Sequence, residues 1–373
     1  MLPIVEEFME LVRISVQSRD ERAIADCLTA KLRVLGFEVA EDGAGKMVGG
    51  NTGNIIGRLK GAANVPPVIL SAHMDRVKNN GSIHPVVNGD TITSDGTTIL
   101  AADDVAGIAV ILDGVRLALA EGIPHGDIEV VFSICEEQGV LGSRYLDYSL
   151  LSAKMAFVFD AAGKVGRIVN QAPTKCKIKV GVHGKNAHAG NEPEKGLNAI
   201  KVAAKALAQM PEGRLSKAST ANFGIIQGGS STNVVCDFVE IVGEARSTNA
   251  QELEAYLVRM RQIFADVAAE CKTEIDVNIE KLYDTFYLPE DSVPAQIVTA
   301  ALSKLGIDTK FTPGGGGMDA NQFNSHGIEA LGVAAGYARN HTVHEEVSIA
   351  ELITGAKAVR EIIHEIYVSA KQK

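Results

Sequence analysis

The sequence lacks the features that mark secreted, disulfide-stabilised and membrane-spanning proteins. Its five cysteines are odd in number, widely scattered and without a C-x-x-C pair, which argues against a disulfide framework and against a structural zinc knot. No apolar stretch approaches the roughly 18 residues that a membrane span needs. The N-terminal MLPIVEEFMELV has no basic segment of the kind that opens a signal peptide. We therefore expect a cytoplasmic protein.

Positive charge is also scarce. Lysine and arginine number 36 against 46 aspartates and glutamates, which gives a formal charge of −10 and a pI of about 5.5. This balance argues against nucleic acid or an anionic membrane as a partner. The apolar content of 46% is ordinary for a soluble globular protein, and 373 residues are too many for a single ordinary core, so two domains are expected.

Four short apolar runs are present, and each ends on residues that can bind metal. Such runs are typical of buried strands, and in open α/β sheets ligands bind just beyond the carboxyl ends of the strands. So many acids at one rim would repel one another unless a cation joined them. The runs are VILSA (68–72) before His73 and Asp75, TTILAA (97–102) before Asp103 and Asp104, EVVFSIC (129–135) before Glu136 and Glu137, and MAFVF (155–159) before Asp160.

The alternation of strands and helices around these runs predicts an α/β fold with a mostly parallel sheet flanked by helices. Apolar residues recur at helical spacing from Val105 to Leu119, between two of the strands. Nearer the N-terminus, Ser18 and Glu21 are spaced as a capping box for a second helix. A further short helix is expected at about 139–149.

The character of the sequence changes after about residue 172. The expected order of elements becomes β-α-β-β-α-β, which is the ferredoxin-like arrangement. We therefore predict a catalytic domain made of residues 1–172 and 287–373, interrupted by an inserted α+β lid or dimerisation domain of residues 173–286.

The residues at the strand ends suit a site with two metal ions. Two ions about 3.5–4 Å apart can polarise a carbonyl and supply hydroxide from water, and zinc accepts both imidazole and carboxylate. Of two adjacent acids, one can bind metal while the other takes a proton from water. His344 in HTVHEE can supply a second imidazole, although the pattern alone does not separate it from His341.

At these residues the chain resembles the dizinc exopeptidases that include peptidase T (tripeptide aminopeptidase), glutamate carboxypeptidase, aminoacylase and succinyl-diaminopimelate desuccinylase. The resemblance covers nearly the whole chain and is strongest toward peptidase T at SDGTTILAADDVAGIA (94–109) and NAHAGNEPEKGLNAI (186–200). The other matching segments are AHMD (72–75), CEEQGVLGS (135–143), FVFDAAG (157–163), GGGMDA (315–320) and HEE (344–346).

The resemblance implies two Zn²⁺ per chain, with Co²⁺ or Mn²⁺ as substitutes, and a homodimer formed through the inserted domain. The implied ligands are His73, Asp103 and Asp160 for one ion and Asp103, Glu137 and His344 for the other. The other implied roles are Glu136 as general base, Asp75 behind His73, His188 polarising the scissile carbonyl, and Asn233 and Arg246 binding a substrate carboxylate.

Three positions depart from the family pattern, and none of them is an expected ligand. Arg76 stands where H-x-D-T has threonine, Val105 replaces a lysine of peptidase T, and Gly315 replaces the arginine of its R-G-G-T-D-G. A lost cation can alter recognition of a substrate terminus, so these departures concern specificity rather than the metal site.

Some candidates have a purely structural alternative. Asp104 could cap the helix that follows it, His188 could be an ordinary loop residue, and Arg246 could lie on a solvated strand face. The expected function is that of a dizinc metallopeptidase that hydrolyses short peptides and releases the N-terminal residue of tripeptides. The alternatives are an N-acyl-amino-acid deacylase, a carboxypeptidase or dipeptidase of the same family, or a catalytically inactive metal-dependent binding or assembly protein.

Overall fold

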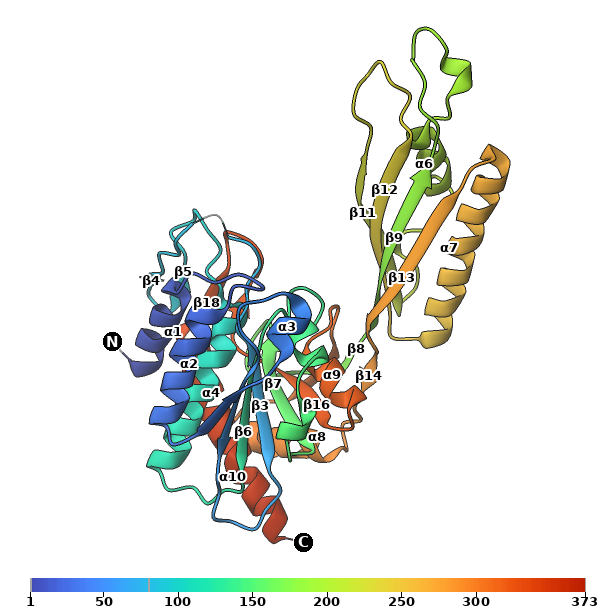
Figure 1. Cartoon of the computed structure of the whole chain (residues 1–373). Helices are drawn as coiled ribbons and strands as arrows, with labels where there is room; N and C mark the ends of the chain where they lie inside the picture. The colour runs from blue at the N-terminus through green and yellow to red at the C-terminus, as the bar shows by residue number, and fades with distance from the viewer. Residues whose placement is uncertain (1, 80, 373) are drawn as a thin grey trace. The chain divides into compact units, whose positions relative to one another are not determined.

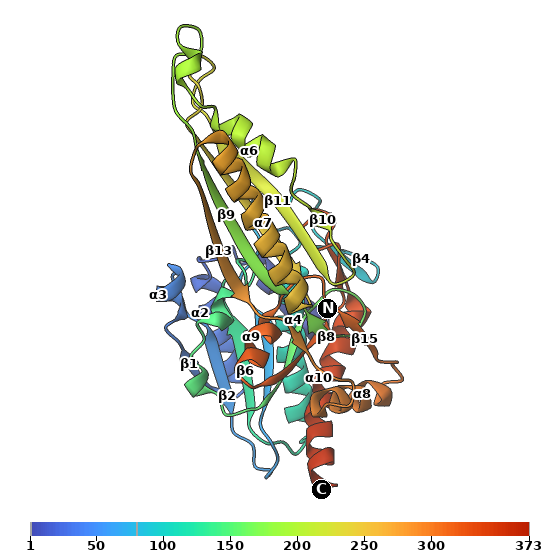
Figure 2. The same cartoon turned by 90° about the vertical axis from the view of Figure 1, so that its right-hand side faces the viewer.

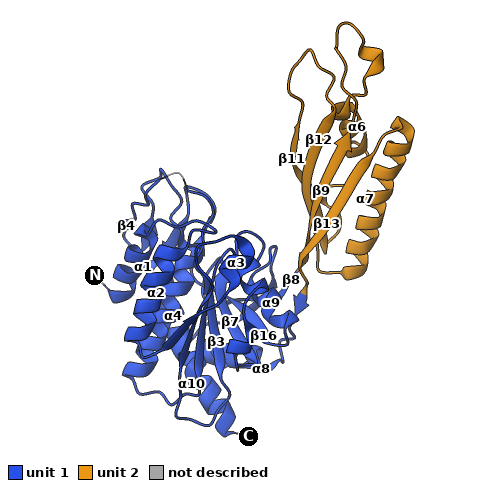
Figure 3. Cartoon of the chain, viewed as in Figure 1, with its two compact units in different colours: residues 1–172, 286–373 blue, residues 173–285 orange. Residues whose placement is uncertain are grey.

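The structure is a computed structural model and describes residues 2–79 and 81–372. It divides into two compact units (Figure 3): Met1–Ala172 with Phe286–Lys373, and Pro173–Thr285. The second unit begins at the residue where the inserted domain was expected to begin and ends one residue before its expected end.

The first unit is an α/β domain (Figure 1). Its elements before the insertion are α1 (Pro3–Arg13), α2 (Arg22–Val34), β1 (Glu38–Glu41), α3 (Ala44–Val48), β2 (Ile55–Leu59), β3 (Val68–His73), β4 (Val86–Asn88), β5 (Thr91–Thr93), α4 (Ala102–Ala120), β6 (Ile128–Ser133), α5 (Leu141–Arg144), β7 (Met155–Ala161) and β8 (Arg167–Ala172). Those after it are β14 (Phe286–Tyr287), α8 (Val293–Lys304), β15 (Lys310–Pro313), α9 (Asp319–Ser325), β16 (Glu329–Ala334), β17 (Tyr337–Ala338), β18 (Glu346–Ser348) and α10 (Ile349–Lys371).

The central sheet of this unit has the strand order β1-β2-β6-β3-β7-β16-β8-β14, with β15 paired to β8. The four strands β6, β3, β7 and β16 are parallel, whereas β1, β2, β8 and β14 join antiparallel at the sides. Because parallel strands end at the same edge, β6, β3 and β7 deliver their last residues side by side. The predicted fold class is confirmed.

Both faces of the sheet are covered, so its strands read as continuous apolar runs rather than alternating ones. In β3, Val68 and Leu70 pack in a core with α1, α2, α4, α8 and α10, while Ile69 packs in a second core with α9 on the other face. All six residues of β3 and all six of β6 are buried. Such a sheet holds its carboxyl edge rigidly, which suits a site built there.

Three local predictions are wrong or incomplete. Residues 97–101 are not a strand but a loop that leads directly into α4. The helix expected at 139–149 is reduced to α5 and a 3₁₀ turn at Tyr148–Leu150. Glu21 is the N-cap residue of α2, but neither it nor Ser18 forms the expected capping box, because both side chains are engaged elsewhere.

The second unit has the predicted order of elements with one additional two-residue strand, β10, between the helices. They are β9 (Thr174–His183), a 3₁₀ turn (Pro193–Lys195), α6 (Ala199–Leu207), β10 (Gly213–Arg214), β11 (Ser219–Gly228), β12 (Phe238–Ser247), α7 (Ala250–Cys271) and β13 (Ile275–Tyr283). The sheet order is β10-β11-β12-β9-β13, with all neighbours antiparallel. Asn198 and Asn249 cap α6 and α7 by accepting backbone N–H groups. Both helices pack on one face of this sheet (Figure 2).

Across residues 2–79 and 81–372, no helix is both long and apolar enough to span a membrane. All five cysteines are free thiols.

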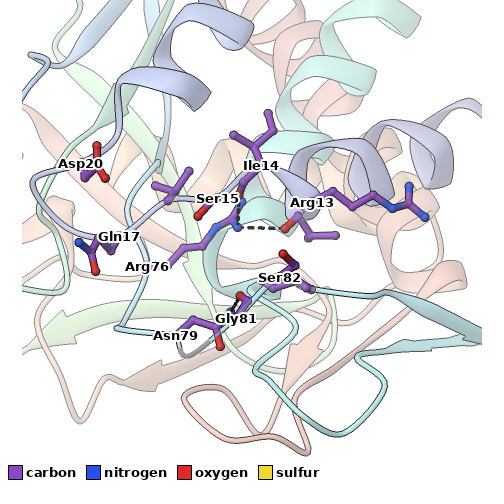
Figure 4. Close-up of a pocket in the computed structure, with 12 residues that line it drawn as sticks. Arg13, Ile14, Ser15, Gln17, Asp20, Arg76, Asn79, Gly81 and Ser82 are labelled. Atoms are coloured by element: carbon purple, nitrogen blue, oxygen red, sulfur yellow. Dashed lines mark hydrogen bonds between the residues drawn. The ribbon is translucent and has the colours of Figure 1, made fainter.

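Arg76, one of the three departures from the family pattern, has a structural explanation. Its guanidinium is buried and donates hydrogen bonds to the backbone carbonyls of Leu11, Val12 and Ile14 at 2.8, 3.0 and 2.8 Å. Figure 4 shows Arg76 pointing toward Ile14. These carbonyls lie at the C-terminal end of α1, where the last carbonyls of a helix lack the usual partner four residues on; that of Leu11 also accepts the N–H of Ile14 at 3.2 Å. Arg76 therefore supplies a cationic C-terminal cap for α1.

We expect Arg76→Met to lower the free energy of unfolding by about 3 kcal/mol, because it leaves buried carbonyls without a donor. Arg13→Met is the matched control. Arg13 also donates to a carbonyl of α1, that of Met9, but it is exposed, so a change within about 0.5 kcal/mol is expected. Urea unfolding of the two variants makes the comparison, and equal losses would contradict the capping role of Arg76.

Candidate metal centre and active site

The candidate metal centre lies at the carboxyl edge of the parallel strands. His73 is the last residue of β3, Asp160 lies near the end of β7, and Glu137 follows β6 after a short turn. Asp103 stands at the start of α4, on a peptide bond to Asp104 that is cis. The loop between β17 and β18 brings in His341. Five segments far apart in the sequence thus meet at one place.

The carboxylate of Asp103 lies between two imidazoles. Its Oδ1 is 3.1 Å from Nε2 of His73, and its Oδ2 is 3.2 Å from Nε2 of His341. Each imidazole faces a second carboxylate: Asp160 Oδ1 is 3.7 Å from His73 Nε2, and Glu137 Oε1 is 2.9 Å from His341 Nε2. The arrangement is two sets of one histidine and one acid that share Asp103.

These distances fit two tetrahedrally coordinated ions. Ligand atoms about 2.1 Å from zinc at tetrahedral angles are about 3.4 Å from one another, and the four separations of 2.9–3.7 Å lie around that value. His73 Nδ1 lies 2.9 Å from the backbone carbonyl of Asp75 and therefore donates to it. In the neutral ring that binds metal, Nε2 therefore carries the lone pair and faces carboxylate oxygens. A cation between them would remove the repulsion between these electron-rich atoms.

The histidine expected from the resemblance is corrected by this geometry. His341, not His344, faces Asp103 and Glu137. Arg339 and His341 both have positive φ, +57° and +62°, and these two bends turn the loop so that the ring of His341 points at the acids. His344 is exposed, and its backbone N–H donates to Thr342 Oγ1. The assignment of His344 as a ligand is therefore withdrawn in favour of His341.

The electrostatics of the centre favour a bound cation. Burial, followed by neighbouring carboxylates, raises the pKa values of Asp104, Glu136 and Asp160 well above their ordinary range. Burial alone would lower the pKa of His73, but the acids around it raise that pKa well above its usual value. Hydrogen bonds to Asp103 and Glu137 raise the pKa of His341 to about 10. Without metal, bound protons have to compensate the negative charge of these buried carboxylates. Divalent ions at the same place can neutralise that charge instead.

Asp104 binds backbone N–H groups, as expected of a helix cap, but in two segments rather than in α4 alone. Its Oδ1 accepts the N–H of Gly107 in the first turn of α4, and its Oδ2 accepts the N–H of His73. One oxygen of Asp104 also lies within 4.8 Å of a ring nitrogen of His73 and a carboxylate oxygen of Asp160. Asp104 therefore ties the start of α4 to the end of β3, and the two ligand-bearing segments hold a fixed separation.

The turn that carries Glu136 and Glu137 is held by side chains from three other segments. Asn54 Oδ1 accepts the N–H of Ile134 at 3.1 Å, and Glu21 Oε1 accepts that of Cys135 at 3.2 Å. The two oxygens of Asp75 accept the N–H groups of Glu136 and Glu137 at 2.8 and 3.3 Å. Four successive N–H groups thus have buried acceptors, which fixes the direction of both glutamates.

Asp75 is placed as expected behind His73, and it does more than the sequence indicated. Its carboxylate lies 3.5 Å from His73 Nδ1, and it also accepts a hydrogen bond from Ser18 Oγ at 2.6 Å. Ser18 and Glu21, which were predicted to cap a helix, are therefore supports of the site. The spacing that resembled a capping box concealed this, because a local pattern does not show that Ser18 and Glu21 bond to segments far away in the sequence.

Other supporting residues gave no clear signal in the sequence. Buried Asp319 accepts hydrogen bonds from Ser133 and Ser143 and lies near enough to raise the pKa of Glu136. Tyr337 donates its hydroxyl to Asp160, and Asn340 donates to Asp103. Only the position of Asp319 in GGGMDA could have singled it out.

The remaining predicted residues lie in the second unit. Nδ1 of His188 accepts the N–H groups of Gly190 and Asn191 at 3.2 and 3.1 Å, which leaves the ring proton on Nε2. The backbone carbonyl of Asn233 accepts the N–H of Ala189, so this residue neighbours His188. Arg246 lies on β12 and forms an ion pair with Glu244 at 2.7 Å.

Comparison with known proteins places these features in a family. Residues 174–272 match the peptidase dimerisation domain of M20 type, and residues 54–211 match peptidase family M28. Over 362 residues the chain is 39% identical to the uncharacterized protein YqjE of Bacillus subtilis (strain 168). The aligned region covers 97% of this chain and 98% of that protein.

Two solved structures are similar over nearly their whole length. The aminopeptidase PepT of Bacillus cereus ATCC 10987 is 39% identical with a TM-score of 0.87, covering 97% of this chain and 98% of that one. A tripeptidase of Staphylococcus aureus subsp. aureus Mu50 is 34% identical with a TM-score of 0.92, covering 98% of each. The chain therefore belongs to the peptidase T family of the M20 metallopeptidases.

Proposed function

We propose that the protein is a dinuclear zinc aminopeptidase that releases the N-terminal residue from short peptides, with tripeptides as its main substrates. The observation that carries the proposal is the carboxylate of Asp103 between His73 and His341, each with a further acid beside it. The substrate class is supported by the two similar structures, which are described as an aminopeptidase and a tripeptidase.

Each ion would have three ligands from the chain. His73, Asp103 and Asp160 would hold one, and Asp103, Glu137 and His341 would hold the other. Imidazole and carboxylate donors of this kind suit zinc, and Co²⁺ or Mn²⁺ could replace it. When bound, the ions polarise the scissile carbonyl and lower the pKa of the attacking water.

Glu136 would move the proton in this reaction. Its backbone is fixed by Asp75, and its carboxylate lies beside the ligand set at the same turn as Glu137. As water attacks the carbonyl carbon, Glu136 accepts the proton that the water loses. As the C–N bond breaks, Glu136 gives this proton to the leaving nitrogen and regains its charge, so that the products are an amine and a carboxylic acid. The acid then loses the second proton of the water to the amine or to solvent.

The state of His188 suits the role proposed for it. Because its Nδ1 accepts two backbone N–H groups, its Nε2–H is a donor, which is what stabilisation of a carbonyl oxygen requires. Asn233 and Arg246 would bind a substrate carboxylate. For Arg246 the support is chemical, since a guanidinium matches a carboxylate in shape and charge.

The second unit would also join two copies of the chain. Its sheet presents the edge of β11, where Ile225 and Ile226 are 50% and 53% exposed, and α6 exposes Ile200 at 45%. An exposed apolar strand edge is a template for pairing with another chain. A homodimer is therefore proposed, and the five free thiols support a reducing, cytoplasmic location.

An aminopeptidase and the alternative amide hydrolases differ in whether they need a free amino terminus on the substrate. We expect a free tripeptide to be cleaved with a kcat/KM at least about 100-fold higher than its N-acetylated form, because a site that binds an ammonium group loses that contact. Both peptides are incubated with the zinc-loaded protein, and chromatography measures how fast the N-terminal residue is released. Preferred cleavage of the acetylated peptide would indicate a deacylase instead, and release of the C-terminal residue a carboxypeptidase.

A further inference from the structure

Glu345 is a buried carboxylate next to the candidate metal centre that is not itself a candidate ligand. Its side chain is 1% exposed. Its Oε2 accepts the N–H groups of Leu100 and Ala101 at 2.9 and 2.7 Å, and its Oε1 accepts the N–H of Asp103 at 2.9 Å. Both oxygens are thus occupied by backbone donors, so Glu345 acts on the chain rather than on an ion.

The donors that Glu345 accepts belong to the turn that presents Asp103. This turn contains Ala101 at a φ of +62°, a left-handed conformation that a residue with a side chain adopts only when its surroundings hold it there. Three N–H groups in this turn converge on one carboxylate, and the structure around them is buried. Glu345 therefore fixes the backbone from which the Asp103 side chain projects.

Glu345 also belongs to the loop that presents His341. Its own N–H donates to the carbonyl of Thr342, which closes the loop behind the histidine. From the same loop, Asn340 Nδ2 donates to Asp103 Oδ2 at 2.6 Å. Two residues of one loop thus hold Asp103, Glu345 by its backbone and Asn340 by its side chain.

Arg76, which follows Asp75 by one residue, is also buried in the first unit, and the charge of Glu345 acts on it to raise its pKa against the lowering effect of burial. The hydrogen bonds of Glu345 link the bridging acid to the loop that carries His341.

We propose that Glu345 is a positioning residue that holds Asp103 and His341 in the register needed to share the second metal ion. The inference rests on the proposed function, because it concerns the same two ligands. It assigns to Glu345 a contribution to metal affinity that is separate from its contribution to folding.

The test compares Glu345→Gln and Glu345→Asp with a matched control, Glu129→Gln. Glu129 is also fully buried and accepts two backbone N–H groups, of Ser152 and Ala153, but it lies at the start of β6, away from the carboxyl edge. Zinc affinity is measured by competition with a chelator, the cobalt-loaded proteins are compared by visible absorption, and urea unfolding is followed on the metal-free proteins.

Both Glu345 variants should weaken binding of the second zinc ion by about 10-fold or more, the usual cost of losing a group that orients a ligand. They should also change the cobalt absorption bands. Glu129→Gln should lower the unfolding midpoint yet keep wild-type affinity and bands. If Glu345→Gln does not fold, Glu345→Asp gives the same readings, since it keeps the charge and is only shorter by one methylene.

Two results would overturn the inference: wild-type zinc affinity in a folded Glu345 variant, or an equal loss in Glu129→Gln. If either result is found while the wild-type protein binds two zinc equivalents, the role of Glu345 is contradicted but the proposed function is not. Fewer than two equivalents in the wild-type protein would instead contradict the proposed function itself.

Discussion

Glu136→Gln is expected to retain two metal equivalents per chain and to lose about 10²–10⁴-fold in kcat, the range that a positioned general base contributes. Glutamine has the shape of glutamate but cannot accept the proton of the attacking water. The backbone N–H of residue 136 would still donate to Asp75, so the turn should keep its conformation. Steady-state cleavage of a tripeptide and elemental analysis of the dialysed protein give the two quantities.

The same substitution one position later is the control. Glu137 is a candidate ligand 2.9 Å from His341 Nε2, so Glu137→Gln should lower metal content as well as activity. If Glu136→Gln kept wild-type turnover, the base would have to be another group, and buried Asp319, whose charge acts on Glu136, is one candidate. If Glu136→Gln lost metal, Glu136 would be a ligand rather than a base.

The positions of the ligands could be predicted because parallel strands constrain where a chain can place side chains. His73 and Asp160 lie at or near strand ends in adjacent strands, and burial of both sheet faces made those strands readable as apolar runs. The run before Asp103 was misread as a strand. It is a buried loop whose N–H groups bond to Glu345, a carboxylate more than 240 residues away, and local sequence cannot reveal such a partner.

The supporting residues were the least predictable part of the site. Glu21 and Asn54 bind backbone N–H groups of the turn after β6 from distant segments. Neither forms a motif with its sequence neighbours, and buried acceptors of this kind become visible only once the chain is folded. For the same reason the sequence could not show which histidine of the loop after β17 is the candidate ligand. Two histidines three residues apart are equivalent in a pattern, and the backbone conformation of the loop decides between them.

The two histidines of that loop provide the sharpest remaining test, because each is the control for the other. His341→Ala removes a ring that faces both Asp103 and Glu137, so we expect the second metal ion to bind more than about 100-fold more weakly, beyond what loss of an orienting group alone costs. His344→Ala removes an exposed ring, and metal affinity should stay within about twofold. Zinc titration with a competing chelator measures both, and peptide cleavage should fall only in His341→Ala. The opposite result would make His344 the ligand and would mean that the loop changes its conformation when metal binds.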